Sequence, residues 1–154
     1  ALRDRLGGSA ALPMIRRRLL LALALVALAT MGVSCKRSED RCSYCGMKVK
    51  PDSAWRVVDT THKKSFDTPR CAFGAKLEGK DPVGALELQD YYDRAPHPAG
   101  DLRYVAGSDV IGPMGPDLVP VMPAMVDKFT KDHGKTAVYT DREIDAKVLK
   151  SLVE

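Results

Sequence analysis

Apolar and polar residues alternate along several short stretches of the chain, a pattern that predicts β-strands. Residues 54–59 and 86–92 alternate in this way and are rich in strand-forming side chains. Residues 64–67 form a shorter stretch of the same kind, and residues 69–79 open with proline and close with glycine, as helices often do. The first part of the domain is therefore predicted to have the order strand, strand, helix, strand.

The same order recurs after residues 94–100, a segment with two prolines and one glycine that is predicted to be a linker. In this second copy a long loop, residues 107–117, separates the first two strands. The predicted elements are strands at 102–106, 118–121 and 136–140, a helix at 124–133, and a final helix that Asp141 would cap.

These elements predict an α+β fold made of two small strand–strand–helix–strand units packed together, with a C-terminal helix. The first unit spans residues 42–93 and the second residues 101–154, which suggests an internal duplication. Each unit alone is small for an independent hydrophobic core, so we expect the units to pack against each other. The long loop would then approach the first unit. One continuous antiparallel sheet without a repeat is the alternative that the pattern leaves open.

The first 35 residues carry the order typical of an export signal: positive charge, a short apolar run and small residues. The charge lies in Arg16–Arg18, and the apolar run spans residues 19–33, fewer than the roughly 20 residues of a membrane-spanning helix. Residues 1–13 precede the first methionine and are interpreted as an upstream extension. Residues 1–35 are thus predicted to be an upstream extension followed by a signal peptide.

The small residues before Cys35 resemble the cleavage box of bacterial lipoproteins, although Gly32 stands where leucine is usual. On this interpretation Cys35 becomes the lipidated first residue of the mature protein, and residues 36–41 form a tether. Acyl chains such as palmitate on Cys35 would anchor the protein to a periplasm-facing surface of the outer or inner membrane. A plain cleaved signal, with Cys35 an ordinary residue, is the alternative.

The net charge of +4 comes from this N-terminal segment. Residues 1–35 contain five arginines and one aspartate, which leaves 19 basic and 19 acidic residues in 36–154. The mature part is therefore formally neutral and has no basic composition that would indicate nucleic-acid binding. Its cysteines are too few for a disulfide-dense scaffold, and their grouping indicates chemistry.

Cys42 and Cys45 form a Cys-x-x-Cys pair near the start of the mature domain. Such a pair is compatible with a metal chelate, a redox dithiol or a structural disulfide. A redox pair usually opens a helix, whereas the residues after Cys45 alternate and then meet a proline, which indicates a strand or a turn. A structural zinc site would need four ligands, for which Cys42, Cys45, His62 and Cys71 are available at an irregular spacing.

Two methionines favour a softer metal. Met47 lies two residues after Cys45, so both sulfurs would point to the same side of an extended segment. Met114 lies between a proline and a glycine in a loop without apolar periodicity, so core packing explains it poorly. Thiolates and thioethers together suit Cu(I) better than other common biological ions. Cys71, in the predicted first helix, is interpreted as a buried structural thiol, and Met122 as a packing residue.

The motif Cys-x-x-Cys-Gly-Met after a lipoprotein-type signal resembles the NosL family, the copper-binding accessory lipoproteins of nitrous oxide reductase assembly. Residues 107–115, Gly-Ser-Asp-Val-Ile-Gly-Pro-Met-Gly, resemble the same family, and the likeness covers about residues 41–141. The resemblance implies two small strand–strand–helix–strand units similar to the core of organomercurial lyase.

The resemblance also implies a non-enzymatic Cu(I) metallochaperone. By matching position, its copper ligands would be Cys45, Met47 and Met114, with Cys42 as a further ligand. The implied partners are a client cuproenzyme such as nitrous oxide reductase and a membrane transporter assembly. Two alternatives stay open: a thiol-dependent oxidoreductase or lyase that uses the Cys-x-x-Cys pair, and a structural zinc-binding interaction domain.

Overall fold

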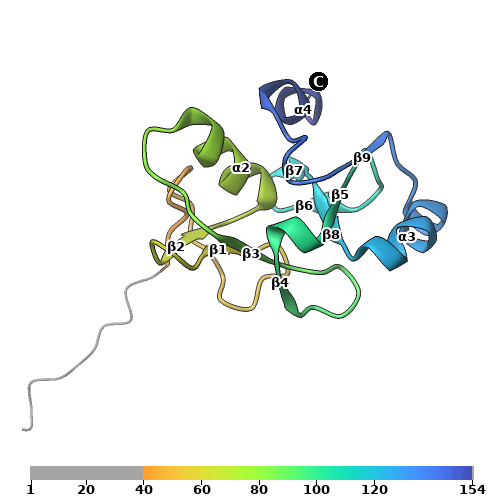
Figure 1. The fold of residues 1–154 in the computed structure, drawn as a ribbon, viewed down its shortest axis with the longest axis horizontal. Helices are drawn as coiled ribbons and strands as arrows, with labels where there is room; N and C mark the ends of the chain where they lie inside the picture. The colour runs from red at the N-terminus through yellow and green to blue at the C-terminus, as the bar shows by residue number, and fades with distance from the viewer. Residues whose placement is uncertain (1–39, 154) are drawn as a thin grey trace, which may run out of the picture. The chain divides into compact units, whose positions relative to one another are not determined.

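The computed structural model describes residues 40–153, and its strands form two main antiparallel sheets (Figure 1). The first sheet has the strand order β2-β1-β3-β4 and the second β8-β5-β9, while β6 and β7 form a separate hairpin. The strands are β1 (Val57–Asp59), β2 (Lys64–Phe66), β3 (Leu86–Gln89), β4 (Pro96–Pro98), β5 (Arg103–Ala106), β6 (Ile111–Gly112), β7 (Gly115–Pro116), β8 (Val119–Val121) and β9 (Ala137–Tyr139). The helices are α2 (Pro69–Glu78), α3 (Val126–His133) and α4 (Ala146–Ser151), with the 3₁₀ turns η1 (Ala99–Asp101) and η2 (Pro123–Met125).

The two sheets share one topology. β1 pairs antiparallel with both β2 and β3, and β5 pairs antiparallel with both β8 and β9. A helix, α2 or α3, precedes the third strand of each set. Each half of the domain is thus a strand–strand–helix–strand unit with its first strand in the middle, and the predicted α+β fold class is confirmed.

The segment 94–100, predicted to be a linker, belongs instead to the first sheet. β4 pairs antiparallel with β3, with His97 opposite Leu88, and η1 follows directly. The prolines at both ends of β4 hid this strand from sequence analysis, but proline is tolerated at a sheet edge because no neighbour on the outer side needs its N–H. Residues 40–153 accordingly lie in one compact unit.

The C-terminal helix also begins later than predicted. Asp145, not Asp141, caps α4, and its carboxylate accepts hydrogen bonds from the backbone N–H groups of Lys147 and Val148. Within residues 40–153, every helix is too short and too polar to cross a bilayer.

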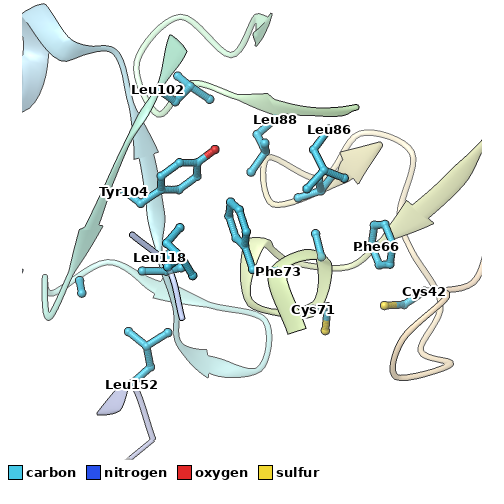
Figure 2. Packing of buried hydrophobic residues seen from close by; sticks show 14 of the residues in the cluster. Cys42, Phe66, Cys71, Phe73, Leu86, Leu88, Leu102, Tyr104, Leu118 and Leu152 are labelled. Atoms are coloured by element: carbon cyan, nitrogen blue, oxygen red, sulfur yellow. The ribbon is translucent and has the colours of Figure 1, made fainter. Parts of the chain in front are cut away.

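One hydrophobic core joins the two halves. Phe73 of α2 packs edge to face on Tyr104 of β5, with ring centroids 5.0 Å apart and an interplanar angle of 88°. Figure 2 shows these rings between Leu88 of the first sheet and Leu118, which precedes β8. A smaller cluster around Phe129 packs α3 against the second sheet. Because the halves share a core, the segment before β1 and the β6–β7 hairpin hold fixed positions relative to α2.

A buried carboxylate closes the turn between β1 and β2. Asp59 is fully buried and accepts hydrogen bonds from the backbone N–H groups of Thr61 at 2.9 Å, His62 at 3.1 Å and Gly84 at 2.9 Å. The N–H groups of Thr61 and His62 donate to Oδ1, and the N–H of Gly84 donates to Oδ2. The ring of His62 also contacts Oδ2, at 2.9 Å. Burial alone would raise the pKa of Asp59, but these hydrogen bonds outweigh burial and lower the pKa to about 2.

Replacing Asp59 with asparagine should therefore reduce the sensitivity of the fold to acid. Because the folded-state pKa lies below the ordinary value of 3.8, the ionised carboxylate contributes stability above that value, and the contribution is lost as the pH falls toward 2. The wild type should lose about 2 kcal/mol more unfolding free energy than Asp59→Asn between about pH 5 and pH 2, as measured by urea titration. Parallel pH dependences for the two proteins would contradict this account.

Candidate metal centre

Three cysteine thiols converge at one edge of the core. The Sγ atoms of Cys42, Cys45 and Cys71 all lie within 4.8 Å of one another. Cys42 and Cys71 are buried and Cys45 is exposed, and Figure 2 shows the two buried residues at the margin of the hydrophobic cluster, near Phe66. A metal–sulfur bond of about 2.3 Å places three ligands roughly 4 Å apart, so this set could hold one ion after a small adjustment.

A tight turn brings Cys42 and Cys45 together. The N–H of Gly46 donates to the carbonyl of Cys42 at 2.9 Å, and the N–H of Cys42 donates to the carbonyl of Met47 at 2.8 Å. Gly46 has a φ of +75°, a conformation that residues with a Cβ rarely adopt. The pair thus lies in a turn and not at a helix N-terminus, which is where a redox dithiol usually lies.

Tyr44, inside this turn, fixes it to α2. Its hydroxyl donates to Oε1 of Glu78 at 2.5 Å, and its ring covers Gly74 so closely that a Cβ there would lie 3.0 Å from the ring. The turn that carries Cys42 and Cys45 therefore rests on the helix that carries Cys71.

Cys71 lies in the first turn of α2. Thr68 caps this helix by accepting a hydrogen bond from the N–H of Cys71 at 3.3 Å, and Pro69 occupies the first helical position. The N-terminal end of a helix favours negative charge because its N–H groups point outward without partners. A metal-bound thiolate at Cys71 would be stabilised in this position.

The β6–β7 hairpin carries a fourth sulfur to the same place. The Sδ atom of Met114, between the two strands, lies 3.8 Å from Sγ of Cys71. Gly115 ends the hairpin turn with a φ of +97°. The guanidinium of Arg70, next to Cys71, donates to the carbonyls of Met114 at 3.2 Å and Pro116 at 3.4 Å. The start of α2 and the hairpin are thus tied together beside the sulfurs.

The three thiols differ in their pKa values. A hydrogen bond from the thiol of Cys71 lowers the pKa of Cys42, and N–H groups of Cys45, Asp67 and Tyr44 add to this effect against the opposing effect of burial. The same hydrogen bond, together with burial, raises the pKa of Cys71, and burial chiefly raises the pKa of Cys45. The pKa of Cys42 is therefore lowered, whereas the pKa values of Cys45 and Cys71 are raised.

Two buried carboxyl groups flank the cluster. Burial and the nearby charge of Cys42 raise the pKa of Asp67, and burial raises the pKa of Asp117. Oδ1 of Asp117 accepts hydrogen bonds from the N–H groups of Arg70 at 2.9 Å and Leu118 at 2.8 Å. Asp117 therefore joins the end of the hairpin to the start of α2.

Comparison with known proteins identifies the family. The family model of NosL matches residues 35–149, which is most of the chain. The chain belongs to the NosL family. Among solved structures, the chain is similar to the copper chaperone NosL from Shewanella denitrificans, with 21% sequence identity and a TM-score of 0.55. The match covers 70% of this chain and 90% of that chain, and it shows a shared fold. No match was found among curated proteins.

Membership of the NosL family confirms the resemblance predicted from the two sulfur motifs. Of the residues predicted to bind metal, the structure brings together Cys42, Cys45 and Met114. The side chain of Met47 is 46% exposed, and its backbone rather than its thioether is hydrogen-bonded to Cys42. The chain turns between Cys42 and Gly46, and the assignment of Met47 as a metal ligand stays a prediction.

Cys71, predicted to be a structural thiol, lies next to the other sulfurs. It is buried, as expected of a structural thiol, but its sulfur also belongs to the cluster. Its place in the first turn of a proline-initiated helix was a signal in the sequence, because that position lowers the free energy of a thiolate. His62, considered for a zinc site, instead contacts Asp59 and is not part of the cluster. Cys35, the predicted lipidation site, lies outside the described residues.

Proposed function

We propose that this member of the NosL family is a Cu(I) carrier, which binds one ion through Cys42, Cys45 and Cys71 with Met114 as a fourth, weaker ligand. The observation that carries the proposal is the convergence of three thiols within 4.8 Å and a thioether 3.8 Å from one of them. The copper chaperone NosL from Shewanella denitrificans, which shares the fold, supports copper as the cargo.

The donor set favours Cu(I) over Zn²⁺. Soft thiolate and thioether ligands suit Cu(I), which accepts low coordination numbers, whereas structural zinc sites complete a tetrahedron with cysteine or histidine. The cluster of described residues contains three cysteines and no histidine, and its additional donor is Met114. A zinc ion here would have to take water or another weak ligand in its fourth position.

Unequal exposure of the ligands suggests how the ion would leave. Cys42 and Cys71 are buried and would hold the ion, whereas Cys45 is exposed and faces the approach of a partner. A ligand of the acceptor could replace Cys45 while the buried thiolates still hold the ion, so that transfer proceeds by ligand exchange without release into water. This role is that of a carrier and not of an enzyme.

Anchoring and delivery complete the proposal. The charged, apolar and small-residue segments before Cys35 support export and lipidation, which would hold the carrier on the periplasm-facing surface of a membrane. Membership of the NosL family supports a cuproenzyme outside the cytoplasm, such as nitrous oxide reductase, as the client, reached beside a membrane transporter assembly.

The test is a competition experiment with the reduced protein under anaerobic conditions. Titration against a chromophoric Cu(I) chelator should give one tightly bound Cu(I) per chain, and Zn²⁺ should not displace it. The ion should also displace protons from the thiols of Cys45 and Cys71, so the apparent affinity should rise with pH. Absence of Cu(I) binding, or preferential binding of zinc, would refute the proposal.

The two methionines provide an internal comparison. Met114→Leu should weaken Cu(I) binding about tenfold because it removes a thioether that lies next to Cys71 and keeps a similar volume. Met47→Leu should change the affinity less than about threefold because its side chain lies at the exposed edge of the site. The same chelator competition measures both variants, and a larger loss for Met47→Leu would reverse the proposed roles.

A further inference from the structure

A groove next to the sulfur cluster is not explained by metal binding alone. It has a volume of about 360 Å³ and runs between the Cys-x-x-Cys turn, α2 and α4. Exposed Cys45 and the sulfur-bearing Met114 are in its walls, and the remainder is mostly apolar. The apolar side chains that line it are Tyr44, Leu149 and Val153.

Parts of this apolar lining are open to solvent. Tyr44 is 44% exposed and Val153 is 63% exposed. Met47, at 46%, extends the exposed apolar surface along the same turn. Exposed apolar side chains gathered at the entrance to a site are typical of a surface that a partner covers.

The charge around the groove is strongly one-sided. The charged side chains that line it, Arg70 and Lys150, are both cationic. The three segments that form its walls contain seven lysines and arginines, three in 41–50, two in 69–78 and two in 146–151, against a single acidic residue, Glu78. Glu78 is already engaged by Tyr44 and Lys80. Residues 36–154 are formally neutral as a whole, so these three segments are more cationic than the mature chain on average.

From these observations we infer that the groove is the docking site for an acidic segment of the copper acceptor that presents a methionine to Cys45. Acidic side chains would meet the cationic walls. Methionine is flexible, apolar and uncharged, so its thioether can enter the groove without the cost of removing a charge from water. The inference deepens the proposed function and rests on it for the cargo, but the docking surface can be tested without metal.

The first experiment uses reduced, metal-free protein and synthetic peptides, followed by amide chemical shifts in NMR. A peptide with a central methionine between glutamates should bind, shift the signals of Leu149 and Val153, and bind less tightly as the salt concentration rises. The same peptide with lysines in place of the glutamates should bind at least about tenfold more weakly. Equal binding of the two peptides, shifts confined to other surfaces, or no binding would overturn the inference.

Variants of the groove separate docking from metal binding. Lys150→Glu should weaken binding of the acidic peptide about threefold or more, whereas Lys135→Glu, the same charge change at an exposed position outside the groove, should not. Both variants should bind Cu(I) as the wild type does. Equal effects of the two substitutions on peptide affinity would show a general charge effect and overturn the assignment of the groove.

The copper-loaded protein tests the role of the thioether. The acidic methionine peptide should bind the copper-loaded protein more tightly than a version with norleucine in place of methionine, because only the thioether can replace Cys45 at the ion while Cys42 and Cys71 still hold it. The two peptides should bind the metal-free protein equally well. Equal affinity of the two peptides for the copper-loaded protein would refute the thioether step. Failure of the wild type to bind Cu(I) would refute the proposed function, whereas docking of the acidic peptide is scored independently with metal-free protein.

Discussion

Replacing Cys71 with serine should weaken Cu(I) binding by about a hundredfold or more. The substitution removes one of the three thiolates within 4.8 Å of one another and also the sulfur that Met114 contacts. Changes to residues that only support metal ligands typically cost ten- to a hundredfold in affinity, and loss of a soft ligand should cost at least as much. Chelator competition with reduced protein measures the effect.

A purely structural Cys71 predicts a different result. Cys71 is buried, so serine would place a hydroxyl among apolar neighbours and could lower stability by that route alone. Alanine avoids this penalty, because it is apolar and suits the helix. Cys71→Ala should therefore lose Cu(I) affinity as severely as Cys71→Ser while it unfolds at a higher denaturant concentration. If Cys71→Ala binds Cu(I) with nearly the affinity of the wild type, Cys71 is a packing residue and not a ligand.

The same two variants test the cause of the lowered pKa of Cys42. The hydrogen bond from the thiol of Cys71 is the largest cause of the lowered pKa of Cys42. Alanine cannot donate this bond, so the pKa of Cys42 should rise in Cys71→Ala, and its thiolate absorbance should appear at a higher pH than in the wild type. Serine can still donate a hydrogen bond, so the pKa of Cys42 should rise less in Cys71→Ser than in Cys71→Ala.

Local signals made much of the fold predictable. Pro69 and Gly79 mark the beginning and end of α2 because proline suits the first helical position and Gly79 adopts a left-handed φ of +63°. Strand β4 escaped prediction because its two prolines are typical of loops, and only pairing with β3, a non-local contact, makes it a strand. An element could therefore be predicted where residues at its own ends mark it, as in α2. It was missed where only pairing with another strand defines it, as in β4.

The candidate site was also predictable only in part. Cys42, Cys45 and Met114 were found because soft donors beside glycines in segments without periodicity are hard to explain by packing. The hydrogen-bonded turn between Cys42 and Gly46 is one of the two conformations, strand or turn, that the sequence left open. Cys71 was undervalued because a cysteine in an apolar helix has the pattern of a core residue, and its distance to the other thiols depends on tertiary packing.

Phe73→Ala should produce the largest loss of stability among single substitutions in α2, about 3–5 kcal/mol. The ring is 1% exposed and packs edge to face on Tyr104 at 5.0 Å, so the substitution empties a space where the two halves meet. Natural domains of ordinary size have about 5–15 kcal/mol of unfolding free energy, so the variant would retain only part of it. Urea denaturation of the reduced, metal-free protein measures the change, with the denaturant dependence expected to stay the same.

Leu77→Ala is the matched control, because Leu77 lies one turn further along the same helix but is 45% exposed. It should cost less than about 1 kcal/mol, since alanine is a good helix former and little buried surface is lost. Excess Cu(I) should then restore more of the lost stability in Phe73→Ala than Zn²⁺ does, because an ion that binds only the folded state stabilises it in proportion to its affinity. Similar losses in the two variants would mean that the shared core does not hold α2, and with it Cys71, against the second half of the domain.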